Sequence, residues 1–387
     1  MENGRNVVSF LSKTLGIKQQ LNSFHDIRTN PTISLRTILW SVFLMPFFGL
    51  KSLLAMDALA RTRSYRRLFD CKRKMVVSDS TVARILTWLM PAQSKQLLYD
   101  LAARIDRLGL LDKALEPGGT PRRIGIIDGS VMGGHHHVTF SLHGRIDCPV
   151  VIEDQHRRGK ELPVALDVID EAYKHLGSCF PDLILCDSLY FNGNMFRKVR
   201  GAGAHILIKS SNPEFRAVLQ EAQFLFEHDV VEGVETDSGY DSERLWHWSM
   251  KKTSGEFAGY PIQIAHLVEN YSKRTTDALA ESLIVSTDFS LSSLSLREAA
   301  HLRWHIENNV FKRISHLAGT KRFYFKDPRR FYSMLRLLFA ALAAFDAYIS
   351  MVRHSPREFK LLLDGIKPTW KNIFSRLQDQ LEDVAFG

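Results

Sequence analysis

Three carboxylates in this sequence have the types and surroundings of a metal-binding set. Asp128 follows the apolar run IGII, Asp187 follows LILC, and Glu307 lies in RWHIENNVFKR. A group of three carboxylates repels itself and is stable only when cations fill it, and hard oxygen ligands select Mg²⁺ or Mn²⁺. Two such ions about 3.5–4 Å apart activate a water or a 3′-hydroxyl and stabilise the leaving oxygen of a phosphodiester. The three residues therefore predict metal-dependent phosphodiester chemistry, provided that the fold brings them together.

Arg303 accompanies the third carboxylate. It precedes Glu307 by four residues, so the two side chains share one face of a helix. Taken alone, this is an ordinary surface ion pair that contributes about 0.2–0.5 kcal/mol. A role in chemistry requires partners from elsewhere in the chain.

The elements that must position these side chains follow from the apolar patterning. The predicted elements, in chain order, are the strands RRIGIIDGS, HHHVTFSL and CPVVIEDQ, the helix GKELPVALDVIDEAYKHLG, the strand PDLILCDSLYFN, the helix GNMFRKVRGAG and the strand HILIKSS. This order predicts an α/β fold with a mixed sheet and flanking helices. Asp128 and Asp187 are each expected at the C-terminal end of a strand, where such sheets open onto a ligand crevice.

The second half of the chain begins with a different pattern. Residues 230–290 alternate apolar and polar side chains around Gly-containing turns, which predicts an antiparallel β insertion. A helix is then expected to begin at Ser295, with Glu298 completing a capping box, so that Glu307 lies in mid-helix. Asp327 and Pro328 have the residue types of the N-cap and first position of a long buried helix. The last stretch, PTWKNIFSRLQDQLEDV, predicts an amphipathic helix.

The positive charge of the chain is confined to its N-terminal end. Residues 1–123 contain 20 Lys and Arg against 9 Asp and Glu, whereas the rest contains 31 against 33. Such a distribution indicates a polyanionic partner, with nucleic acid favoured over an anionic membrane surface, and a solvated basic face as the alternative. Four cysteines without CxxC spacing indicate neither a zinc site nor a disulfide framework, which fits a reducing cytoplasm.

Residues 1–120 are predicted to be helical, and the segment RTRSYRRLFDCKRK carries seven basic residues and one acidic residue. Ser78, Asp79 or Ser80 can cap the helix that follows. A short capped helix after a basic turn is typical of a helix-turn-helix DNA reader, and also of many ordinary helices. The candidate DNA-binding residues of this region are Arg61, Arg63, Arg66, Arg67 and Arg84.

Composition shifts divide the chain. The predicted parts are a helical, basic DNA-binding and dimerisation region (1–120), the first part of an α/β core (121–229), the β-rich insertion (230–290), the last part of the core (291–353) and a helical tail (354–387). Two apolar stretches, around Pro46 and around Asp346, contain charged residues or Pro and are predicted to be buried helices rather than membrane spans.

The sequence resembles the DDE transposases of bacterial insertion sequences, members of the RNase H-like integrase superfamily. The resemblance lies in IIDGS, in LILCDSLYFNGNMFRKVRGAGAHILIKSS and in REAAHLRWHIENNVFKRISH, and it extends over about residues 120–350. It implies an RNase H-like core, with the β insertion of the cut-and-paste subgroup between the second and third carboxylates. It also implies that Asp128, Asp187 and Glu307 bind the metal ions and that Arg303 holds a phosphate near the cut.

The chain departs from the family pattern at two places. The tyrosine expected three residues before Arg303 is Ala300, and the lysine expected seven residues after Glu307 is Ile314. Lys312 and Arg313 are the candidate substitutes for that lysine in binding DNA. Release of the ends through a DNA hairpin does not follow from the resemblance.

Other conspicuous residues receive weaker interpretations. Trp246 and Trp248 alternate, so both face one side of a strand, where they pack in the core or stack on an unpaired base near the cleavage point. The run 135–137 of three histidines is assigned no metal site, because neighbours on a strand face opposite ways. The further acidic residues Glu153, Asp154 and Asp167 are interpreted as a solvated face.

We therefore predict a cytoplasmic, nucleoid-associated DNA transposase with Mg²⁺ as cofactor and Mn²⁺ as a substitute. It would bind double-stranded DNA at element ends and target, act as a homodimer on DNA, and have no membrane partner. Two alternatives remain at this stage. One is an RNase H-like nuclease or resolvase without strand transfer, and the other is a non-catalytic DNA-binding descendant of a transposase.

Overall fold

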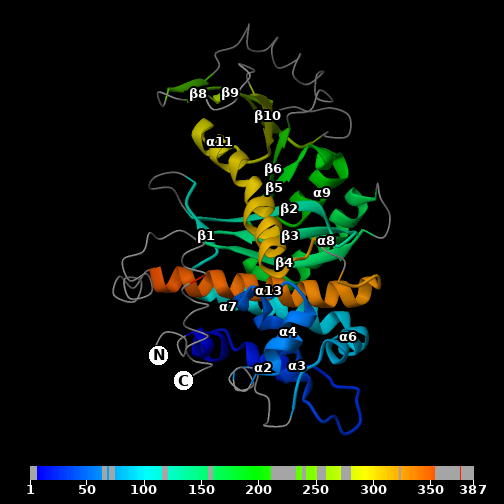
Figure 1. Cartoon of the computed structure of the whole chain (residues 1–387). Coiled ribbons are helices and arrows are strands. Elements are labelled where there is room, and N and C mark those ends of the chain that lie inside the picture. Colours follow the sequence, from blue (N-terminus) through cyan, green and yellow to red (C-terminus); the bar gives the residue numbers. More distant parts are fainter. Residues whose placement is uncertain are drawn as a thin grey trace.

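A ten-stranded sheet forms the centre of the fold (Figure 1). The computed structural model describes residues 7–62, 68, 75–115, 121–155, 160–210, 232–237, 241–250, 259–271, 280–321, 324–353 and 375. The strand order is β4-β3-β2-β5-β6-β10-β9-β8-β7, with β1 paired to β2 off this path. The strands are β1 (Asp112–Lys113), β2 (Arg122–Met132), β3 (His135–His143), β4 (Asp147–Asp154), β5 (Leu183–Asp187), β6 (His205–Ser210), β7 (Glu232–Asp237), β8 (Asp241–Met250), β9 (Ile262–Tyr271) and β10 (Ala280–Ser286).

The first half of the sheet has the predicted mixed topology. β2, β3 and β4 form an antiparallel meander, and β5 and β6 run parallel to β2 and to each other. Parallel strands need crossover connections, which here contain α8 (Glu161–Leu176) and α9 (Gly193–Gly201). α8 packs on β3 and β4, and α9 packs on β6. The apolar runs that predict the strands are buried, since helices cover the sheet.

The predicted β insertion extends this same sheet. β10 pairs antiparallel with β6, and β9, β8 and β7 follow as antiparallel neighbours. In Figure 1 these strands continue the sheet upward, beyond β6 and away from α13. The prediction of an antiparallel β segment before the last core helices is therefore confirmed.

The N-terminal region is helical, as predicted. Its elements are η1 (Phe10–Thr14, a π-helical turn), α2 (Ile17–Asn22), α3 (Leu35–Leu44), η2 (Met45–Phe48, 3₁₀), α4 (Leu53–Ala60), α6 (Asp79–Trp88) and α7 (Pro91–Arg107). Among the three candidate caps Ser78 is the N-cap of α6, where its side chain accepts a hydrogen bond from the Thr81 N–H. Most of the basic segment before α6, including Arg63, Arg66 and Arg67, lies outside the described residues.

A long apolar helix, α13 (Pro328–Arg353), lies between the sheet and the N-terminal helices (Figure 1). Its start is as predicted, because the Asp327 side chain accepts a hydrogen bond from the Arg329 N–H at 3.0 Å. In length and composition α13 could cross a membrane, but 83% of its most apolar window is buried in the fold. The other apolar stretch is bent by 105° between residues 35–48 and 53–60. Both stretches are buried helices, as predicted.

The prediction of a single helix around Glu307 is wrong. Three consecutive helical segments take its place. α11 (Ser293–Leu302) begins earlier than predicted, since the Ser292 side chain caps it by accepting from the Ser295 N–H. Next come a π-helical segment, η7 (Ile306–Phe311), and α12 (Lys312–Ala318). Two short 3₁₀ turns, η3 (Gly177–Cys179) and η4 (Ser188–Tyr190), complete the described elements. The predicted C-terminal amphipathic helix lies outside the described residues apart from position 375.

We expect Arg336→Ala to lower the free energy of unfolding by about 3 kcal/mol. Arg336 on α13 is buried, donates to the Ile152 carbonyl at 2.9 Å and lies 3.8 Å from the Glu153 carboxylate. Its removal leaves a carbonyl and part of a carboxylate charge unpaired in the core. Urea denaturation measures the loss. Arg329→Ala, at an exposed position on the same helix, is the matched control and should change the unfolding free energy by less than about 0.5 kcal/mol; equal losses would contradict the role of Arg336.

Candidate active site

Asp128 and Asp187 lie level with each other on adjacent strands. The parallel register pairs Ile126 of β2 with Leu185 of β5, and each aspartate follows two residues later on the same face. Neighbouring strands are about 4.8 Å apart, so the two carboxylates project side by side from this face of the sheet. One expectation needs correction: β2 does not end at Asp128. It continues to Met132 along β3, and only its pairing with β5 has ended.

Glu307 reaches this place from η7, which packs against β2 and β4. Its backbone carbonyl accepts a hydrogen bond from the Lys312 N–H, five residues later, which is the π-helical pattern. Single π turns inside helices occur frequently at functional sites. The π-helical turn of η7 includes Glu307, the third carboxylate of the predicted metal-binding set.

Arg303 joins the two sides of the site. Its guanidinium Nη1 lies 3.2 Å from Glu307 Oε1 and 3.6 Å from Asp128 Oδ2. The arginine side chain is 9% exposed and that of Asp128 10%, so water screens the interaction little. This geometry excludes the ordinary exposed ion pair that the spacing alone would suggest.

Burial dominates the electrostatics of Asp128, and neighbouring carboxylates add to its effect. Burial raises the pKa of its carboxyl from an ordinary value of 3.8 to about 7, opposed by Arg303 and reinforced by the charges of Asp187, Glu307 and Glu161. A divalent cation between these oxygens would remove the repulsion. Their all-oxygen donor set fits Mg²⁺ or Mn²⁺, so the residues present fit the divalent ion that the chemistry requires.

A fourth carboxylate, Glu161, stands beside the three predicted ones. Its Oε1 accepts a 2.6 Å hydrogen bond from the Tyr190 hydroxyl. It lies against the backbone of Gly129, where an added Cβ would come within 2.3 Å of the glutamate carboxyl carbon. Glu161 was not predicted as a site residue, because GKELP is typical of an ordinary acidic first turn of a helix. Glycine directly after Asp128 was the available signal, since it leaves room for a close neighbour.

The remaining predicted residues have partners other than these carboxylates, are exposed, or have side chains outside the described part of the chain. Lys312 donates to Asn308, and Arg313 forms a paired interaction with Asp346 of α13. Arg61 pairs with Asp57, and Arg84 is exposed on α6. The two tryptophans at 246 and 248 are on β8, as predicted, but their side chains are outside the described part.

The positions that depart from the family pattern are apolar and enclosed. Ala300 on α11 and Ile314 on α12 are both fully buried. Trp304, by contrast, is 45% exposed beside the site, and its ring centroid lies 4.5 Å from the Arg303 guanidinium carbon. The sequence predicted no role for it.

Most of the remaining histidines and acidic residues named from the sequence are packed into the fold. His135 contacts the Phe325 carbonyl at 2.8 Å, and His137 is buried, which lowers its pKa to about 4. Glu153 was interpreted as solvated, but it lies in a partly buried network 2.5 Å from Lys95. That interpretation is corrected, because β4 packs against α13 and α7. Asp167 is exposed, as expected.

Residues 119–344, more than half of the chain, match the family described as transposase DDE domain. The chain belongs to this transposase family. The mixed sheet, its flanking helices and the N-terminal helical region are those of an RNase H-like transposase. Membership implies binding to DNA and a nucleic-acid-processing enzyme that uses divalent metal. A search of curated proteins found no match.

We expect Asp128→Asn to stabilise the transposase in the absence of divalent ions at pH 8. Folding raises the pKa of Asp128, so the folded state binds the proton more tightly than the unfolded state between about pH 4 and pH 7. The free energy of unfolding therefore falls as pH rises through this window. At pH 8 Asp128 is ionised in the folded state, so the full free-energy cost of burying its charge is present. Asparagine carries no charge and removes about 2–4 kcal/mol of this cost. Urea denaturation at a series of pH values, in chelator, measures the difference.

The difference between the two proteins should be nearly gone at about pH 3, because Asp128 is then protonated in both the folded and the unfolded state. Asp167→Asn removes an exposed carboxylate from α8 and serves as the control. A stabilisation by Asp128→Asn that stayed the same from pH 4 to pH 8 would contradict the electrostatic cause.

Proposed function

We propose that this transposase cleaves the ends of an insertion sequence and joins them to target DNA. The proposal is supported by the level positions of Asp128 on β2 and Asp187 on β5, together with Arg303, which lies between Asp128 and Glu307 of η7. In this proposal the three carboxylates hold two Mg²⁺ ions, for which Mn²⁺ substitutes. When bound, the ions supply activation of a water or 3′-hydroxyl and stabilisation of the leaving oxygen.

Arg303 has two successive roles in the proposed reaction. Without ions its guanidinium offsets the charges of Asp128 and Glu307. Bound cations would take over this neutralisation, and the arginine could then donate to a phosphate oxygen next to the cut. Arginine suits this role because its planar fork matches phosphate and it stays charged. The exposed Trp304 ring beside it offers a surface on which a base displaced at the cleavage point could stack.

The rest of the chain is proposed to hold the DNA. Residues 1–120 would bind the element ends and dimerise, using Arg61, Arg63, Arg66, Arg67 and Arg84. The β insertion of residues 230–290 would contribute Trp246 and Trp248 near the cleavage point, and Lys312 and Arg313 would contact DNA from the core, formed by 121–229 and 291–353. Residues 354–387 would form a helical tail. Joining requires two ends held together, so a homodimer on DNA in the bacterial nucleoid is the proposed working form.

A cleavage and joining assay tests the proposed chemistry. The substrate is a duplex carrying the inverted repeats that flank the gene, incubated with target DNA and Mg²⁺. We expect the wild type to cut and join, and Glu307→Gln to lose at least about 10³-fold in rate, equivalent to about 4 kcal/mol of transition-state stabilisation. DNA binding by the variant, measured by fluorescence anisotropy in Ca²⁺, should stay within about threefold.

Glu298→Gln is the matched control, because Glu298 is a partly exposed carboxylate on the adjacent α11 that pairs with Lys113. It should keep wild-type rates. Equal activity of wild type and Glu307→Gln would refute the assignment of Glu307. Cleavage without any joined product would indicate a nuclease and refute strand transfer.

Binding to the element ends should weaken steeply with salt, and Arg84→Ala should flatten that dependence. Each phosphate contact removed lowers the slope of log K against log salt by about 1. Arg84 is exposed on α6, in the basic N-terminal region. Lys174→Ala removes one exposed positive charge from α8 and is the control. If both variants changed the slope equally, the charge of the N-terminal region would have no special part in DNA binding.

A further inference from the structure

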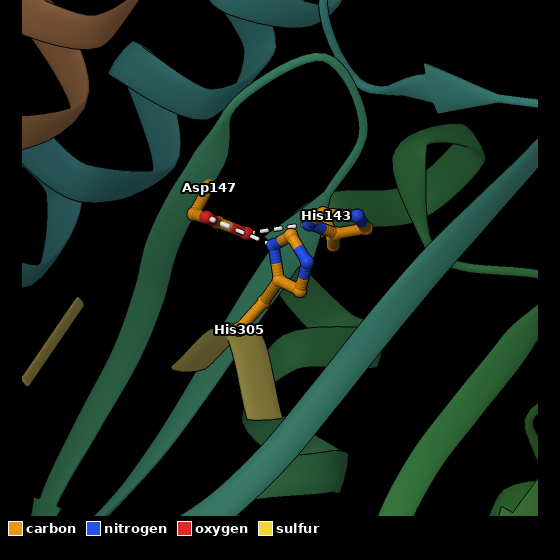
Figure 2. A group of neighbouring side chains, drawn as sticks. All are labelled: His143, Asp147 and His305. Atoms are coloured by element: carbon orange, nitrogen blue, oxygen red, sulfur yellow. Dashed lines mark hydrogen bonds and ion pairs between the residues drawn. The ribbon is translucent and has the colours of Figure 1, made fainter. Parts of the chain in front are cut away.

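A second group of ligand-type side chains lies on the other side of the helix that carries Glu307. His143 is the last residue of β3, Asp147 the first of β4, and His305 directly precedes η7. Figure 2 shows the His305 and His143 rings next to each other, both facing the Asp147 carboxylate. His143 Nδ1 lies 2.5 Å from Asp147 Oδ1, and His305 Nδ1 lies 3.8 Å from Asp147 Oδ2. One ligand atom from each residue falls within 4.8 Å of the others.

Asn309 adds a fourth polar group to the same point. Its side-chain amide nitrogen lies 2.9 Å from Asp147 Oδ2 and 2.8 Å from His305 Nδ1. The nitrogen and oxygen of such an amide are nearly isosteric, and rotation by half a turn exchanges them. After that rotation the amide oxygen would stand beside the same two atoms. Two imidazole nitrogens, one carboxylate and one amide oxygen would then face a common centre.

Asp147 contributes a buried carboxylate to this group. Its side chain is only 7% exposed, and both of its oxygens face side-chain nitrogens of His143, His305 and Asn309. The imidazole rings of His143 and His305 are 4.5 Å apart, so both can offer a nitrogen lone pair to one ion.

An entry path adjoins the group. A surface hollow of about 450 Å³ is lined by residues that include Asp147 and Asn309. Arg313 and Asp346 also line it, and they form an ion pair with each other, which offsets the positive charge of that arginine. An ion can reach the carboxylate through this hollow, while the half-exposed His305 forms one side of the group.

We propose that His143, Asp147, His305 and Asn309 form a binding site for a transition-metal ion, with Zn²⁺ as the best chemical match. Two imidazole ligands select Zn²⁺ and related ions over Mg²⁺, and metal–ligand distances of about 2.0–2.2 Å require only small movements of these side chains. The site is separate from Asp128, Asp187 and Glu307 and does not depend on their chemistry. Because His305 precedes Glu307 by two residues, the ion would fasten η7 to the β3–β4 hairpin.

Cobalt spectroscopy on the full-length, tag-free protein tests the site. Co²⁺ replaces Zn²⁺, and its visible absorption is strong in four-coordinate sites with nitrogen ligands and weak in six-coordinate oxygen sites. The titration is done in the Glu307→Gln background with excess Mg²⁺, so that the carboxylate group does not contribute. We expect one Co²⁺ per chain with strong absorption, displaced by one equivalent of Zn²⁺.

His305→Gln and His143→Gln should each lower the strong absorption at least tenfold. His316→Gln, at an exposed position on α12, is the matched control and should keep it. Zn²⁺ should raise the melting temperature of the parent protein but not that of His305→Gln. This comparison does not depend on whether His143→Gln folds. Weak absorption alone, or strong absorption that survives His305→Gln, would overturn the proposal.

Discussion

The geometry of the candidate active site depends on the two ion pairs that the Arg303 guanidinium forms. The guanidinium contacts Asp128 on the sheet and Glu307 on η7 at once, so it ties the last helices of the core to the strand that carries the first carboxylate. The charges of Asp187 and Glu161 also act on Asp128, and burial makes the mutual repulsion of these carboxylates costly. The arginine offsets that cost in the absence of cations. The fold therefore holds together a group of carboxylates that a divalent ion would complete.

Much of the fold follows from local patterns in the sequence. The runs IGII and LILC lack polar residues. They form β2 and β5, which are parallel strands covered by helices, and such strands show no alternation of apolar and polar residues. Their spacing around one predicted helix requires a crossover, which brings Asp128 and Asp187 into register. The caps at Ser78 and Asp327 act within three residues, so the starts of α6 and α13 could be located.

The features that the sequence did not predict depend on contacts between distant segments. The π turn at Glu307 has no local signature, because η7 is shaped where it packs on β2 and β4. Glu161 approaches Asp128 only because α8 begins next to Gly129 in space, 32 positions away in sequence. His143 and Asp147 look like ordinary hairpin residues until His305, more than 150 residues later, joins them. Ser292, not the predicted Ser295, is the N-cap of α11. The two serines offer the same capping chemistry, so the sequence alone could not distinguish them.

The central claim is that Asp128, Asp187 and Glu307 together hold the ions that act on DNA. Anomalous diffraction from crystals grown with Mn²⁺ and a duplex of the element end tests it most directly. The account predicts anomalous peaks within about 2.3 Å of oxygens from all three carboxylates, with the Arg303 guanidinium turned toward a phosphate. It would be contradicted if no peak lay between these carboxylates while Mn²⁺ and DNA were bound elsewhere on the protein.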